Sequence, residues 1–170
     1  SSDLSFSAGE PDFNTPEPIR EAAKRALDEG KTKYTPAAGL PKLRSAIAAD
    51  YARRNREVSQ DEVVVTVGGK QALYNATQVL FDEGDRVILP SPYWVSYPAQ
   101  LRLAGAEPLV VDTGIETGFK MQPEQLEEAL IADGVRGIIL CSPSNPTGAT
   151  YTEDELARFG ELLAEYDDVV

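Results

Sequence analysis

The sequence contains no histidine and only one cysteine, Cys141. Without histidine, the chain alone cannot build a Ser-His-Asp triad, a Cys-His pair or most zinc sites, and we expect no metal centre. A single cysteine cannot form an internal disulfide, which favours a reducing compartment such as the cytoplasm. Because Cys141 ends an apolar run, we interpret it as a small core residue and not as a nucleophile.

Long apolar runs are also missing, and basic residues are fewer than acidic ones. No segment has the length of a membrane span or the pattern of a signal peptide. The 16 lysines and arginines face 28 acidic residues, which gives a net charge of -12. This charge argues against nucleic acid or an anionic membrane as a partner, so any bound anion must be captured locally.

Helix and strand patterns alternate along most of the chain. We expect a first helix capped by Thr15 and ended by Gly30, and a second helix after Pro41. The expected strands are Val63 to Val67, Arg86 to Leu89, Pro108 to Val111 and Gly137 to Cys141. We expect one further helix from Pro123 to Leu130, and others after Gly69, after Pro92 and at the capping box of Thr152 and Glu155. Short strands alternating with longer helices predict an α/β fold, with a mostly parallel sheet and helices on both faces.

Three irregular loops directly follow expected strands. They are Gly68-Gly69-Lys70, Ser91 to Trp94, and Ser142 to Gly148. Ligands of parallel sheets bind at the carboxyl ends of the strands, so we expect these loops to converge on one site. Two glycines that lead into a helix leave backbone N–H groups at the positive end of the helix dipole, which is typical of a phosphate site. A plain strand-to-helix turn is the alternative.

Several motifs carry a resemblance to a known family. They are Ser7-Ala8-Gly9-Glu10-Pro11-Asp12-Phe13, Lys33-Tyr34, Gly68-Gly69-Lys70-Gln71-Ala72-Leu73, Pro92-Tyr93-Trp94 and Asn145-Pro146-Thr147-Gly148. In this order and spacing they resemble the N-terminal part of a class I aminotransferase, among the fold-type I pyridoxal-phosphate enzymes. The nearest likeness is to the bacterial aspartate aminotransferases.

The resemblance implies a domain organisation and a reaction. Residues 31–170 would form part of the large domain that binds pyridoxal 5'-phosphate, and residues 1–30 would be a segment and helix leading into it. The enzyme would move an amino group between an amino acid and a 2-oxo acid through this cofactor. Because Lys70 suits an acidic side chain, aspartate or another dicarboxylic amino acid is the expected substrate.

The resemblance also implies roles for individual residues. Gly68, Gly69 and Lys70 would bind the cofactor phosphate, and Trp94 would stack on its ring. Asn145 would hydrogen-bond the phenolic oxygen of the cofactor. Substrate contacts would come from Gly9, at the carboxylate, and from Lys70, Trp94 and Asn145. Taken singly, a core tryptophan, an Asn-Pro turn, a solvated lysine and a loop glycine remain open as alternatives.

Two further features follow from the same resemblance. Tyr34 matches a tyrosine that reaches the cofactor phosphate held by a partner chain, which implies a homodimer. The Ser91–Pro92 and Asn145–Pro146 bonds fall where relatives often have cis peptides, and we expect cis bonds at both positions.

The chain departs from the family in what it does not contain. It stops at Val170, as a further strand begins and before the aspartate that pairs with the pyridine nitrogen, the lysine that holds the cofactor covalently and the arginine that clamps the substrate carboxylate. We therefore expect the 170 residues to be a portion of a longer enzyme, with a complete short protein that has lost the chemistry as the alternative.

Other functions remain open. A carbon–sulfur lyase on the same scaffold would use the same cofactor, and a non-catalytic cofactor-binding module needs no lysine. A dinucleotide-binding domain is less consistent with the sequence, because no expected strand is followed by Gly-x-Gly-x-x-Gly. A Walker-type Gly-Lys-Ser or Gly-Lys-Thr is also missing.

Overall fold

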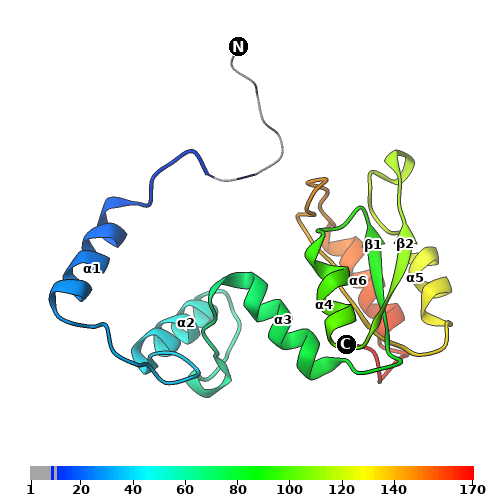
Figure 1. Ribbon diagram of the computed structural model, residues 1–170. Helices are drawn as coiled ribbons and strands as arrows, with labels where there is room; N and C mark the ends of the chain where they lie inside the picture. Colours follow the sequence, from blue (N-terminus) through cyan, green and yellow to red (C-terminus); the bar gives the residue numbers. More distant parts are fainter. Residues whose placement is uncertain (1–8, 10) are drawn as a thin grey trace, which may run out of the picture. The chain divides into compact units, whose positions relative to one another are not determined.

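The computed structural model describes residue 9 and residues 11–170 (Figure 1). The chain divides into two compact units that meet in the sequence between Val65 and Thr66. This division reflects packing within the chain, and the family domain boundary expected after residue 30 stays a prediction. Each unit is described by itself.

The first unit contains two helices and a short 3-10 turn. Helix α1 spans Glu17–Asp28, α2 spans Pro41–Arg53, and the turn η1 spans Gln60–Glu62. Gly30 follows α1 as expected, and its N–H donates to Leu27 O at 2.9 Å. The expected cap at Thr15 is wrong: Pro16 keeps an extended ψ of 140° and is itself the N-cap. Thr15 therefore stands one residue too early to accept from the first helical turn.

The expected strand from Val63 to Val67 is also wrong. The segment is extended and Val65 N donates to Ala38 O at 3.0 Å, but no strand among the described residues pairs with it. Val64 is 63% exposed and Val67 is 89% exposed. An apolar run becomes a β-strand only where a neighbouring strand completes the hydrogen-bond ladder.

The second unit is a three-stranded parallel sheet with four α-helices. Its elements are α3 at Gly68–Leu80, β1 at Arg86–Ser91, α4 at Ser96–Leu103, β2 at Glu107–Asp112, the 3-10 turn η2 at Ile115–Thr117, α5 at Pro123–Leu130, β3 at Val135–Ile138 and α6 at Glu153–Leu163. The strand order is β2-β1-β3, and both pairings are parallel. The expected helices and the strands β1 and β2 are confirmed to within about two residues, an ordinary scatter for boundaries.

Strand β3 ends three residues before the expected end at Cys141. Ile139 N still donates to Ile88 O at 2.9 Å, but the following residues leave the sheet for the loop. On the other side of β3, Val170 N donates to Arg136 O at 3.0 Å and Val170 O accepts from Ile138 N at 2.9 Å. These alternating bonds follow the pattern of a parallel ladder.

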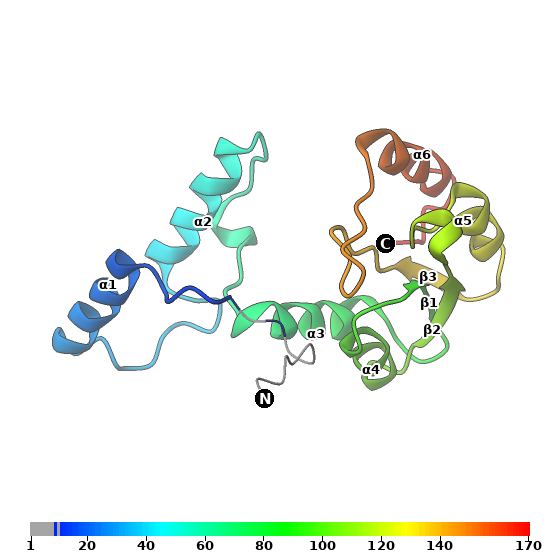
Figure 2. The ribbon, with the colours of Figure 1, turned by 90° about the horizontal axis from the view of Figure 1, so that it is seen from above.

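Both faces of the sheet are covered, which confirms the expected α/β arrangement. Val87 and Ile88 are both fully buried and point to opposite faces. Ile88 packs in a core with Leu126 and Phe159 from α5 and α6, whereas Val87 packs with Phe81 and Leu101 on the face of α4. Figure 2 shows α4 on one side of the strands and α5 and α6 on the other.

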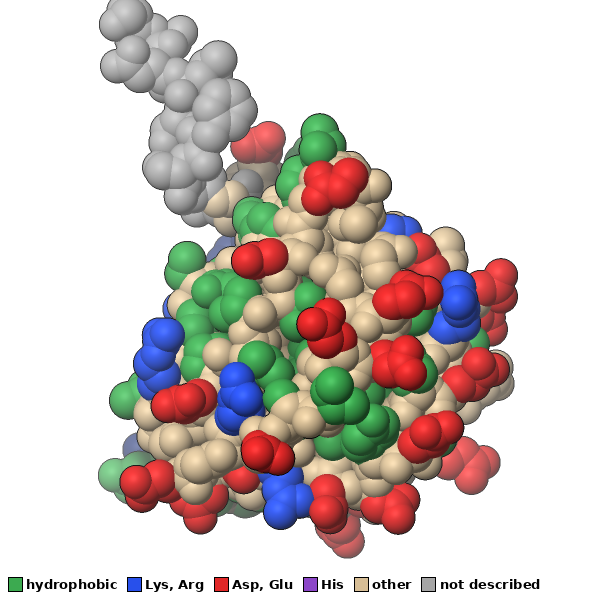
Figure 3. All heavy atoms as spheres, turned by 90° about the vertical axis from the view of Figure 1, so that its right-hand side faces the viewer, with side chains coloured by type: hydrophobic (Ala, Val, Ile, Leu, Met, Phe, Trp, Pro, Cys, Tyr) green, Lys and Arg blue, Asp and Glu red, His purple; other side chains and the backbone are tan. Residues whose placement is uncertain are grey.

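Among the charged side chains on the face shown in Figure 3, acidic ones are more frequent than basic ones. No helix in residues 11–170 is both long and apolar enough to span a membrane. Within the same residues, no cluster of three or more histidine, cysteine or acidic side chains is arranged to hold a metal ion.

Candidate functional site

The turn into α3 is held by its own residues. Gly68 has a φ of 76°, a left-handed conformation that favours glycine. Gly68 N donates to Thr66 O at 2.9 Å, and Val67 N donates to Gln71 Oε1 at 2.6 Å. Thr66 Oγ1 donates back to Gly68 O at 3.0 Å. These bonds fix the turn without using the N–H groups of the next two residues.

Those next N–H groups, of Gly69 and Lys70, have no acceptor within the part of the chain that the structure describes. A Cβ atom added at Gly68 or Gly69 would meet no atom of the described residues within 4 Å, so these residues leave the space beside the turn open. Unpaired donors at the start of a 13-residue helix, next to open space, fit an anion such as a phosphate.

Trp94 lies beside this turn. The Lys70 Nζ atom is 4.9 Å from the centroid of the Trp94 ring, within the range of a cation–π contact. The ring is half-buried rather than enclosed in either core cluster, and Tyr97 meets it edge-on with centroids 5.4 Å apart and planes at 84°. The structure therefore brings together three of the predicted residues: Gly69, Lys70 and Trp94.

The loop after β1 is tied to the end of β2. Ser91 Oγ donates to Asp112 Oδ1 at 2.8 Å, and Thr113 Oγ1 donates to Ser91 O at 2.5 Å. The expected cis bonds at Ser91–Pro92 and Asn145–Pro146 are both confirmed, and Ser142–Pro143 is cis as well.

The loops after β1 and β3 converge on one cavity. The cavity is lined by Leu89, Pro90, Ser91, Pro92, Tyr93, Tyr97, Phe119, Ile139, Leu140, Cys141, Ser144 and Tyr151. Asn145 lies in the second loop with an exposed side chain, and within residues 11–170 its side chain makes no hydrogen bond. The structure thus places Asn145 next to the cavity-lining Ser144 but does not join it to Trp94 or to the glycine turn.

Cys141 is half-buried at this cavity rather than part of a core cluster, so its interpretation as a core residue is wrong. Its Sγ donates to Pro143 O at 3.3 Å because β3 has already ended and the chain turns here. Burial, followed by a hydrogen bond with the Cys141 side chain, raises the pKa of Tyr97 to about 12. Tyr97 therefore stays neutral at physiological pH.

Two predicted site residues lie in the first unit. Tyr34 is fully exposed, and Lys33 and Thr35 flank it in a shallow surface pocket. Gly9 is exposed, and a Cβ atom there would meet no atom of the described residues within 4 Å. Its neighbours Ser7, Ala8 and Glu10 in the predicted motif lie outside the described residues. The roles of Tyr34 and Gly9 remain predictions.

Comparisons with known proteins decide the family. The family model described as "Aminotransferase class I and II" matches residues 1–170. The chain belongs to this aminotransferase family. The aspartate aminotransferase of Bacillus subtilis is 48% identical over 168 residues, which cover 98% of this chain and 42% of that protein. An aspartate/prephenate aminotransferase of Cereibacter sphaeroides is 50% identical, with 98% and 42% covered.

Solved structures of the family share the fold. The aspartate aminotransferase of Thermus thermophilus with maleate has a TM-score of 0.89 and 49% identity, over 94% of this chain and 42% of that one. The enzyme of Rhizobium meliloti has a TM-score of 0.91 and 39% identity, over 96% and 41%. The chain therefore spans about two-fifths of the length of the aminotransferases it matches.

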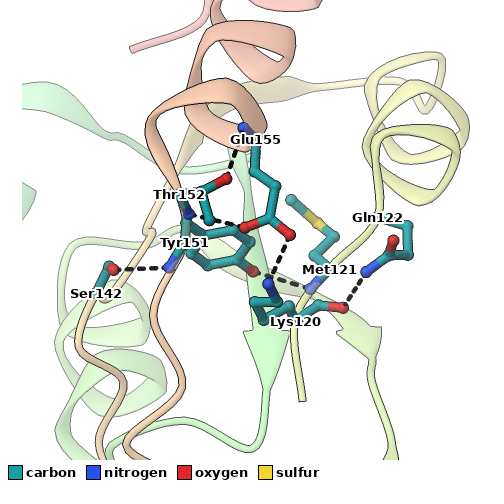
Figure 4. A network of polar contacts seen from close by, with 7 residues as sticks. All are labelled: Lys120, Met121, Gln122, Ser142, Tyr151, Thr152 and Glu155. Carbon is teal, nitrogen blue, oxygen red and sulfur yellow. Dashed lines mark hydrogen bonds and ion pairs between the residues drawn. The ribbon is translucent and has the colours of Figure 1, made fainter. Parts of the chain in front are cut away.

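A polar network supports the loop of Asn145 in this aminotransferase chain (Figure 4). Tyr151 N donates to Ser142 Oγ at 3.1 Å, at the base of the loop. The Tyr151 hydroxyl accepts from Met121 N at 2.8 Å, and Lys120 pairs with Glu155 at 2.5 Å. Sequence reasoning found only the capping box in this network, where Glu155 N donates to Thr152 Oγ1 at 3.2 Å.

Gln100 makes a second contact that the sequence did not predict, a hydrogen bond to the first turn of α3. It lies on α4, is 6% exposed, and its Nε2 donates to Lys70 O at 2.9 Å. One signal was available, because Tyr97 and Gln100 are three residues apart and share a face of an expected helix. A polar residue at a buried helix position needs a partner, but the sequence does not tell which partner it has.

Proposed function

We propose that the protein carrying this chain is a pyridoxal-phosphate-dependent aminotransferase. It would move an amino group between a 2-oxo acid and an amino acid, with aspartate or another dicarboxylic amino acid as donor. The observation that supports this most directly is the pair of unused N–H groups at Gly69 and Lys70 beside the Trp94 ring. The family membership supports the same reaction class.

The residues present fit the cofactor in kind. Gly69 and Lys70 N–H would hold its phosphate at the positive end of α3, and Trp94 would cover one face of its ring. Asn145 would donate to its phenolic oxygen from the loop after β3. When bound, the cofactor draws electrons away from the Cα atom of the substrate, while these residues orient the ring and exclude water.

The choice of substrate rests on charge. Lys70 adds a positive charge at the edge of the proposed site in a chain whose net charge is -12. The Thermus thermophilus relative was solved with maleate, which is a dicarboxylate, and several relatives are named for aspartate. A dicarboxylic amino acid would place its side-chain carboxylate near Lys70, and Gly9 would approach its α-carboxylate.

We also propose that the active unit is a homodimer in the cytoplasm. Tyr34 is fully exposed and free to enter the site of a second copy. The single cysteine suits a reducing compartment.

The test uses the natural full-length protein with added pyridoxal phosphate. Formation of oxaloacetate from aspartate and 2-oxoglutarate supports an aminotransferase. Pyruvate release from cystathionine without transfer to 2-oxoglutarate would instead identify a carbon–sulfur lyase. Cofactor binding with neither reaction would identify a non-catalytic module and overturn the proposal.

A further inference from the structure

Gln100 joins α4 to the turn that begins α3. Its side-chain amide reaches the carbonyl of Lys70, in the turn whose N–H groups face the proposed phosphate. Lys70 also lies within α3, where the carbonyl of a residue accepts from the N–H of the residue four positions later, here Tyr74. The bond from Gln100 is therefore an additional one, made to a carbonyl that the helix already uses.

The other half of the Gln100 amide is unpaired. The Oε1 atom is buried and has no hydrogen-bond partner within the described residues. The opposite orientation of the amide would place this oxygen against the Lys70 carbonyl, so the observed orientation is the favourable one. A buried acceptor without a partner is destabilising, and an apolar side chain of similar length would remove that penalty. Folding stability alone therefore does not account for a glutamine here.

The same face of α4 also holds the indole. Tyr97, one helical turn before Gln100, is 8% exposed and meets the Trp94 ring edge-on. Tyr97 N donates to Trp94 O at 3.1 Å. Two neighbouring residues of α4 thus contact the two parts of the proposed cofactor site, the ring and the turn.

We infer that Gln100 is a positioning residue for phosphate recognition, which acts through the Lys70 carbonyl to hold the first turn of α3 at a fixed distance from Trp94. This inference rests on the proposed function. It assigns to Gln100 a contribution to the binding of the phosphate group and none to the binding of the pyridine ring.

The experiment compares two ligands in the natural full-length protein. Dissociation constants are measured for pyridoxal 5'-phosphate and for pyridoxal, which lacks the phosphate. In Gln100→Met we expect the phosphorylated ligand to bind roughly three- to tenfold more weakly, the effect of one hydrogen bond, and pyridoxal to bind as before. The melting temperature should stay the same or rise. Amide hydrogen exchange at Tyr74, whose N–H the helix ladder directs at the Lys70 carbonyl, should become faster.

The matched control is Gln125→Met. Gln125 also donates its side-chain amide to a backbone carbonyl, that of Asp112 at 3.0 Å, on the far side of the sheet from α4. This variant should leave the preference for the phosphorylated ligand unchanged.

Three outcomes would overturn the inference. Equal weakening of both ligands in Gln100→Met would mean a general structural role. A lower melting temperature or failure of this variant to fold would mean that Gln100 is kept for stability. If the unaltered protein binds both ligands equally well, the phosphate site itself is absent and the proposed function fails as well. The first two outcomes would overturn only the role of Gln100 and would leave the proposed function in place.

Discussion

The Lys70 ammonium nitrogen lies 4.9 Å from the centroid of the Trp94 ring, although the two residues belong to turns on either side of β1. The contact is an attraction between a cation and the negative face of the indole, worth about 0.5–1 kcal/mol where water has access. It holds one positive charge beside the proposed cofactor ring. That charge is available to an acidic substrate that approaches the same place.

The first prediction concerns substrate choice. Lys70→Met should lower kcat/KM for aspartate roughly tenfold or more relative to alanine, because a hydrogen bond to a charged group is worth about 1.5–3 kcal/mol. Rates with both amino donors are measured at saturating cofactor. Lys42→Met, which removes an exposed lysine of α2, is the control and should not alter the ratio. An equal loss of kcat/KM for aspartate and alanine would show that Lys70 does not bind the second carboxylate of aspartate.

The second prediction separates the two glycines of the turn. Gly68→Ala should lower the free energy of unfolding by about 1–2 kcal/mol, because its φ of 76° is unfavourable for a residue with a Cβ atom. Gly69→Ala should leave stability unchanged or raise it by up to about 1 kcal/mol, because the added atom meets nothing and lies in a helix.

Cofactor binding should show the reverse order, with Gly69→Ala affected more than Gly68→Ala. The Gly69→Ala methyl group would occupy the open space beside the unused N–H groups and weaken pyridoxal phosphate binding, with little effect on pyridoxal. Denaturant unfolding and ligand titration of both variants test this pair of expectations. Unchanged cofactor affinity in Gly69→Ala would place the phosphate elsewhere.

The third prediction concerns alkaline pH. The pKa of Tyr97 is raised to about 12 from its ordinary value of 10.0, chiefly by burial. The folded state therefore keeps a proton that the unfolded chain loses between these values. The contribution of Tyr97 to stability should therefore be fully present below pH 10 and be lost as pH rises from 10 towards 12.

Tyr97→Phe isolates this effect. The difference in unfolding free energy between this variant and the unaltered protein should change across pH 10 to 12 and be constant below pH 10. Tyrosine ionisation is followed by absorbance. If the change near pH 10 is smaller by one tyrosine in Tyr97→Phe than in the unaltered protein, Tyr97 ionises normally and the prediction is wrong.

Local sequence features predicted much of the fold. The alternation of strands and helices and the Thr152 capping box are set by residues close in the chain, and the structure confirms them. The strand expected at Val63 to Val67 was wrong because a strand also depends on a partner that the run itself does not specify. Strand β3 ended early for a related reason, since the loop to Gly148 begins its own hydrogen bonds at Cys141.

The candidate site was predicted in part. The turn at Gly68 and the ring of Trp94 are adjacent, as the sequence predicted, but for another reason, because the turn follows no strand of the sheet. Their link through Lys70 and Gln100 depends on how α3 packs on α4, which no spacing in the sequence encodes. Gly9 and Tyr34 belong to the first unit, so their roles still rest on the family resemblance.

The fourth prediction concerns acid and the loop of Asn145. A hydrogen bond from Lys120, together with the backbone N–H of Thr152, holds the pKa of Glu155 below its ordinary value of 4.5. A lowered pKa in the folded state means that the stabilisation is present above pH 4.5 and is lost as pH falls through the folded value. Lys120 also lies over the Tyr151 ring, with Nζ 5.9 Å from the ring centroid. Lys120 therefore links the ion pair with Glu155 to Tyr151, the residue that bonds to Ser142 at the base of the loop.

Glu155→Gln should therefore reduce stability at pH 7, with a difference from the unaltered protein that shrinks as pH falls below 4.5, and should speed amide exchange in residues 142–151 at pH 7. Glu161→Gln, on the same helix, has no such partner among the described residues and serves as the control. Asn145 is carried by the anchored loop, so cofactor affinity should weaken in Glu155→Gln without a change in the preference for phosphorylated over unphosphorylated ligand. Exchange in this loop that is the same in both variants would show that the loop holds its conformation without the ion pair.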